Sequence, residues 1–84
     1  MQNAMVGLIV RTISGHDKNE IFTILAVKNN FVYLSNGKNR SIEKPKRKNI
    51  KHIIKLGENE MIRNLLNENK LNNSHIIRIL KDYR

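Results

Sequence analysis

Val-Gly-Leu-Ile-Val-Arg-Thr-Ile at 6–13, Glu-Ile-Phe-Thr-Ile-Leu-Ala-Val at 20–27 and Phe-Val-Tyr-Leu-Ser at 31–35 form the stretch that decides the fold. These runs are rich in β-branched and aromatic residues, which favour strands. A polar loop separates the first two, and Asn29-Asn30 predicts a tight hairpin because Asn tolerates positive φ. Apolar residues occupy both faces of the second run, as expected of a strand buried in a small closed sheet.

Two more strands follow in the next part of the chain. Asn36-Gly37 is a strong hairpin signal, so we expect a short fourth strand at 39–43. Pro45 interrupts any ladder in the basic run after it, and residues 50–56 form a fifth strand or its continuation. Five short strands joined by tight turns predict a mainly β protein, with a small antiparallel barrel over residues 5–56.

After Gly57 the apolar pattern changes to the spacing of helices, giving a helical appendage at 57–84. One stripe contains Met61, Ile62, Leu65 and Leu66, and a second, with Ser74 as the expected N-cap, contains Ile76, Ile77, Leu80 and Tyr83. Helices this short need tertiary packing. We expect them to pack on each other or on the barrel of a monomer, and dimerisation through these stripes is the alternative.

Positive charge is concentrated in the middle of the chain. The 84 residues carry a formal net charge of +9, and residues 38–55 hold eight of the 16 cations against the single carboxylate of Glu43. Clustered cations attract polyanions, above all the phosphate backbone of nucleic acids. A solvated basic loop is the plainer alternative. A membrane surface is disfavoured because no amphipathic basic helix carries these charges.

Several function classes find little support in the sequence. Cysteine is absent, which excludes disulfides and thiolate chemistry, and the three histidines are isolated from one another, so no metal site is expected. No nucleophile, phosphate-loop or dinucleotide motif is present, so we expect neither catalysis nor a cofactor. The absence of a secretory signal pattern and of a membrane-length apolar run favours a cytoplasmic protein.

The segment from Gly7 to Phe22 resembles the KOW motif, an element of SH3-like barrels in ribosomal proteins and transcription factors. The chain is most similar to the small KOW-domain RNA-binding proteins of Gram-positive bacteria, which resemble archaeal and eukaryotic large-subunit ribosomal proteins. Asn36-Gly37-Lys38, the stretch 43–46 and the closing helix at 74–80 also fit. The resemblance implies an SH3-like barrel that binds RNA, expected to be ribosomal or ribosome-associated, with a ribosomal protein as a further possible partner.

Two positions depart from the family pattern. Asn19 stands where the family usually has Gly, and because Asn is the commonest other residue at positive φ, the turn is expected to survive. His16 stands where the family favours Arg, which weakens any phosphate or base contact made there. Asp17 is expected to satisfy its own backbone in an Asx-type turn, since a carboxylate facing phosphate would repel it.

The candidate RNA-binding residues are the cations of the middle third, with a supplement from the first loop. Lys44-Pro45-Lys46-Arg47-Lys48 is the sharpest local signal, because four cations on a restricted backbone can follow a phosphate chain. An exposed, partly mobile linker would have the same composition. The complete set is Arg11, His16, Lys18, Lys38, Arg40, Lys44, Lys46, Arg47, Lys48 and Lys51.

Few residues are credible readers of bases. Phe22 and Phe31 are expected in the barrel core, which leaves Tyr33 as the best candidate for stacking. Recognition should therefore rest on the backbone and shape of structured RNA. Two alternatives remain: a protein-interaction module whose helical stripe docks on a translation or transcription component, and a DNA-binding accessory protein.

Overall fold

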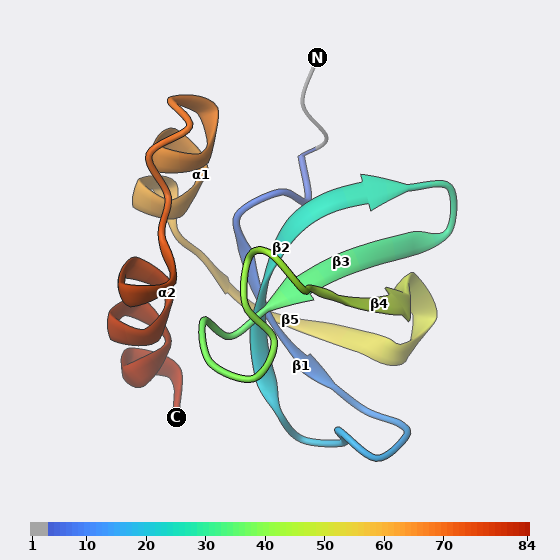
Figure 1. Cartoon of the computed structure of the whole chain (residues 1–84). Coiled ribbons are helices and arrows are strands. Elements are labelled where there is room, and N and C mark those ends of the chain that lie inside the picture. Colours follow the sequence, from blue (N-terminus) through green and yellow to red (C-terminus); the bar gives the residue numbers. More distant parts are fainter. Residues whose placement is uncertain (1–3) are drawn as a thin grey trace.

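A computed structural model describes residues 4–84 and shows a five-stranded antiparallel sheet followed by two α-helices (Figure 1). The strands lie in the order β4-β3-β2-β1-β5. Their bounds are β1 Leu8–Thr12, β2 Ile21–Lys28, β3 Phe31–Ser35, β4 Lys46–Asn49 and β5 Ile53–Glu58, and the helices are α1 Glu60–Asn67 and α2 Asn73–Leu80. Short 3₁₀ turns, η1 Ile50–His52 and η2 Lys81–Tyr83, follow β4 and α2. Within residues 4–84, no helix has the length and apolar character needed to cross a bilayer.

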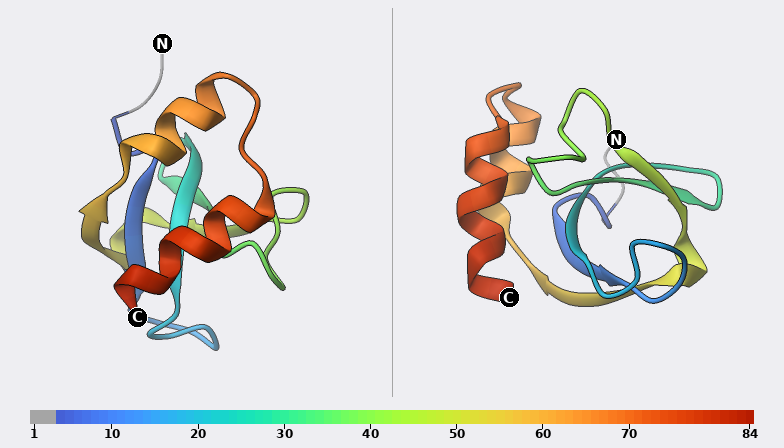
Figure 2. Two further views of the ribbon diagram at one scale, coloured as in Figure 1. Left: turned by 90° about the vertical axis from the view of Figure 1, so that its left-hand side faces the viewer. Right: turned by 60° about the horizontal axis from the view of Figure 1, so that its bottom comes forward.

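The sheet curls round on itself, as Figure 2 shows on its right, and encloses one apolar interior. Register shifts interrupt β1 opposite β5 and β2 opposite β3, and such irregularities bend strands. The turn η1 then carries the chain directly from β4 at one edge to β5 at the other. The buried side chains of this interior come from the first three strands: Leu8, Val10, Phe22, Ile24, Val32 and Leu34.

The helices cover the outer side of β1 and β2 and build a second core there (Figure 2). Ile9 of β1 packs with Ile62 of α1 and with Ile76 and Leu80 of α2, and all four are fully buried. Strand β2 turns Phe22 and Ile24 inward and Ile21 and Leu25 toward the helices. Its two apolar faces therefore have two different partners, and Ile62, Ile76 and Leu80 of the helical stripes are buried within the chain.

The expected fourth strand at 39–43 is wrong. Those residues belong to the long connection 36–45, and β4 lies in the basic run itself, paired with β3 from Leu34↔Lys46 to Phe31↔Asn49. Pro45 directly precedes β4, a position where proline costs no ladder bond. Gly37 does adopt positive φ (78°), but a Cβ there would lie 2.5 Å from the Asn73 carbonyl oxygen. The turn at Gly37 therefore lies close against the start of α2, and it closes through the Arg40 carbonyl, which accepts from the Asn36 N–H.

The remaining boundaries differ in smaller ways. The predicted fifth strand splits into η1 and β5, which runs to Glu58, two residues beyond the expected barrel boundary. The N-cap of α2 is Asn72 rather than Ser74, because the Asn72 side chain accepts from the His75 N–H while His75 Nδ1 accepts from the Asn72 N–H. Asn59 caps α1 with a single bond, in which its side chain accepts from the Ile62 N–H.

Candidate nucleic-acid interface

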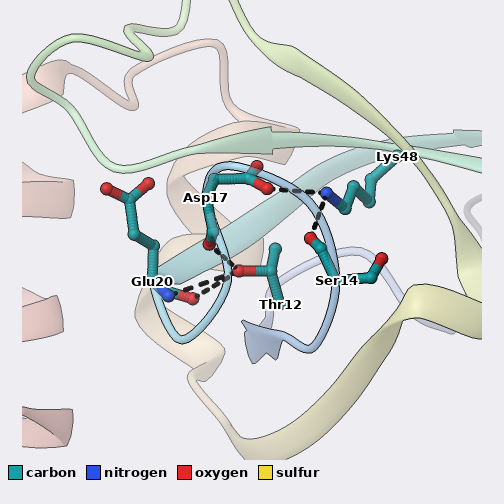
Figure 3. Close-up of polar contacts among 5 residues, drawn as sticks. All are labelled: Thr12, Ser14, Asp17, Glu20 and Lys48. Carbon is teal, nitrogen blue, oxygen red and sulfur yellow. Dashed lines mark hydrogen bonds and ion pairs between the residues drawn. The ribbon is translucent and has the colours of Figure 1, made fainter.

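The loop between β1 and β2 is held in shape by its own backbone and by Thr12. Asn19 has a φ of 70°, which confirms the predicted positive-φ turn, and its N–H donates to the Thr12 carbonyl (2.8 Å). The Thr12 hydroxyl donates to the Asp17 carbonyl and accepts from the Glu20 N–H (Figure 3). Arg11 Nη1 donates to the Asn19 side chain (2.7 Å), so this cation braces the loop. His16 and Lys18 stay exposed at its outside.

An ion pair ties this loop to β4. Lys48 Nζ lies 2.6 Å from Asp17 Oδ1 and also donates to the Ser14 carbonyl (2.8 Å), with the two side chains only 11% and 12% exposed (Figure 3). Lys48 opposes the buried Val32, so its side chain starts from the inner side of the sheet. A hydrogen bond from the Asp17 backbone to its own carboxylate is in line with the expected local role, and the pair with Lys48 adds a contact that the sequence did not predict. Lys48 is a structural cation rather than a free surface one.

The ionisation of Asp17 is coupled to this arrangement. Burial works to raise the pKa of the Asp17 carboxyl, but the hydrogen bond and charge of Lys48, with a smaller effect of the Lys46 charge, outweigh it. The pKa therefore lies below its ordinary value. The second carboxylate oxygen, Oδ2, is buried and has no hydrogen-bond donor among residues 4–84. Removing either partner would leave the other charge poorly compensated.

Asp17→Asn is expected to lower the free energy of unfolding by about 2 kcal/mol at pH 7, because Lys48 would keep a nearly buried charge without its counter-ion. Since the folded pKa of Asp17 is depressed, the wild-type advantage is present above the unfolded pKa of about 4 and is lost as the pH falls through the folded value. Urea unfolding of the wild-type protein and of Asp17→Asn across this pH range measures the difference in unfolding free energy. The exposed Asp82→Asn serves as the control, and a gap that does not shrink as the pH falls below the unfolded pKa would contradict the assignment.

The cations along β4 and its flanks form the most continuous basic segment. Lys44, Arg47 and Lys51 are exposed and Lys46 is half-buried, and none of these four pairs with a carboxylate in residues 4–84. We call them the β4 edge, because β4 is the last strand of the sheet on its side. Lys48 and Lys55 are the cations of 38–55 that do form ion pairs, Lys55 with Glu58 at 3.4 Å.

The other predicted cations lie away from this edge. Lys38 and Arg40 belong to the connection 36–45, which Asn73 fixes to α2 by accepting from the Ile42 N–H and donating to Glu43. This hydrogen bond from Asn73 lowers the pKa of the exposed Glu43 carboxyl. Lys38 shares a hollow of about 380 Å³ with Arg84 and Asn19. The eight cations of 38–55 are thus distributed over the 36–45 connection, the β4 edge and β5.

Phe31 is not in the barrel core, contrary to expectation. It lies on the outer side of β3 with Tyr33, because the intervening Val32 points into the interior, and both rings are half-buried. The Arg47 guanidinium sits over the Phe31 ring, 4.7 Å from its centroid. Side chains alternate between the two sides of a strand, so Phe31 and Tyr33 share one side of β3 whatever its pairing with other strands. This placement could therefore have been predicted from the sequence. The core expectation for Phe22 is confirmed.

Comparison with known proteins adds no assignment. No protein-family model matches this chain, and no curated protein sequence matches it. Functional inference therefore rests on the chain's own residues, on their arrangement and on the KOW resemblance of the sequence.

Proposed function

We propose that this protein binds RNA through the β4 edge, supported by the exposed His16 and Lys18 of the neighbouring loop. The expected ligand is structured RNA of ribosomal or ribosome-associated origin, as the KOW resemblance implies. We also propose that the fold is an SH3-like barrel, which is the fold that the KOW resemblance implies. Its support is the pairing of β1 with both β2 and β5, and the 3₁₀ turn that joins β4 to β5.

One observation carries this proposal. Lys46 and Arg47 lie on β4 and Lys44 and Lys51 flank it, all within eight residues, and none of the four forms an ion pair in residues 4–84. Such a strip has the charge to replace condensed counterions along a phosphate backbone. Figure 1 places β4 on the side of the barrel away from α1 and α2, so the helices do not cover it.

The protein-interaction alternative loses its main support. It relied on a helical stripe free to dock on a partner, and Ile76 and Leu80 of that stripe are fully buried against the sheet. A partner protein would have to use another surface. The choice of RNA rather than DNA as the ligand rests on the KOW resemblance, so the binding experiment must compare both nucleic acids.

Binding to RNA is expected to weaken with salt along a log–log slope of about −4 to −5, if about six phosphates are neutralised. Fluorescence anisotropy of a labelled structured RNA between low and moderate salt measures this slope. DNA of matched length and structure is the parallel ligand, and we expect it to bind less tightly. A slope near zero would show that phosphate contacts do not contribute to binding, and tighter DNA binding would overturn the choice of RNA.

A further inference from the structure

The outer side of β3 and β4 combines aromatic rings, cations and carboxamides on one uncovered surface. Cross-strand pairing places Tyr33 opposite Arg47 and Phe31 opposite Asn49, and Lys28 opposes Phe31 on the other flank. Directly opposed residues of an antiparallel pair lie on the same side of a sheet. No carboxylate is among these five residues, and the apolar contacts of α1 and α2 with the sheet are made by Ile9, Ile21 and Leu25 of β1 and β2.

A hollow continues this surface at the end of the β2–β3 hairpin. It measures about 350 Å³ and is lined by Asn30, Asn49, Ile50 and Lys51. Asn30 precedes Phe31 in the chain and Asn49 opposes it, so two of the lining residues are neighbours of Phe31. Asn49 Oδ1 already accepts from the Lys51 N–H, so the Asn49 Nδ2 donors and the Asn30 carboxamide are the groups offered to a base edge. Lys51 adds a cation for a neighbouring phosphate.

We propose that this surface, formed by Phe31, Tyr33 and Arg47 with the adjoining hollow, binds unpaired nucleotides of the RNA by stacking their bases. This deepens the proposed function and rests on it. Bases in a paired RNA helix are already stacked, and its deep groove is closed to side chains, so only a loop, bulge or single strand offers free base faces. Arg47 over Phe31 extends the platform with a second planar group and places positive charge beside it.

The test compares a single-stranded RNA, a hairpin with an open loop and a fully paired duplex, each with the same number of phosphates. We expect the single strand and the hairpin to bind about tenfold more tightly than the duplex at equal salt. Tyr33→Leu and Phe31→Leu should each weaken binding to the unpaired ligands by about tenfold, leaving duplex affinity and the salt slope unchanged. Tyr33→Phe keeps a ring and should retain the preference.

Control variants separate stacking from charge and from folding. Lys44→Gln removes a cation without touching a ring, and should weaken binding to all three RNAs and reduce the salt slope. Thermal melting shows whether each leucine variant is folded. If Phe31→Leu does not fold, the RNA affinities of Tyr33→Phe and Tyr33→Leu still test the role of stacking. Equal affinity for duplex and single strand would overturn this inference and leave the proposed function standing. Failure to bind any RNA would overturn both.

Discussion

Reversing the charges of Lys44, Arg47 and Lys51 together to Glu is expected to weaken RNA binding by about 100-fold at ~0.1 M salt. All three side chains are exposed and none forms an ion pair in residues 4–84, so the change breaks no internal salt bridge, although it removes the Arg47 guanidinium from the Phe31 ring. Lys48 is left intact because its ion pair with Asp17 holds the first loop. Anisotropy titrations at fixed salt, with melting curves for each protein, measure the loss.

A matched variant distinguishes a local site from the field of the whole protein. Lys70, Arg78 and Lys81 are exposed in the C-terminal part, and their reversal to Glu removes the same amount of positive charge away from β4. We expect this variant to lose much less affinity than the β4 triple, since contacts shorter than the Debye length of about 10 Å dominate. Equal losses in both variants would mean that net charge, and not the β4 edge, attracts the RNA.

Leu80→Ala is expected to lower the free energy of unfolding by about 3 kcal/mol. Leu80 is 0% exposed and packs with Ile9, Ile62 and Ile76, so truncation leaves a cavity between α2 and the sheet. Such a loss is a large share of the stability of a small domain. Denaturant unfolding followed by far-ultraviolet circular dichroism measures it.

Met61→Ala provides the comparison on the exposed side of the helices. Met61 is 59% exposed, so its truncation should change the unfolding free energy by no more than about 0.5 kcal/mol. Sedimentation of both variants reports on the oligomeric state. If Leu80→Ala changed the oligomeric state but not the stability, the helices would serve a dimer interface, and the packing described above would be contradicted.

The first three strands and the two helices could be predicted because their signals are local. Residues 31–35 alternate between interior and exterior, Asn29 takes a positive φ of 56° at the predicted hairpin, and Ile76 and Leu80 face one side at helical spacing. Asn19 in the first loop follows the same logic, since its φ depends on a property of the residue itself.

The position of β4 could not be predicted because its determinants are distant in sequence. Lys-Arg-Lys-Asn has little intrinsic preference for a strand, and it becomes one through pairing with β3 and through the pair between Lys48 and Asp17. Gly37 lies close to Asn73, more than thirty residues away in sequence, and this contact places the 36–45 connection beside the start of α2. Composition identified the basic segment, but only tertiary structure shows which of its cations are used internally.

The pairing of β1 with β5 has a consequence for how the molecule forms. Leu8 lies opposite Glu58, so β1 can pair with β5 only after all the other strands of the sheet have been synthesised. Ile9 also stays uncovered until Leu80 has been made. Loops of this length must close before their contacts contribute, which slows folding and leaves a nascent strand edge open to other chains. The polypeptide is thus most vulnerable to misassociation during synthesis, just before its C-terminal helix arrives.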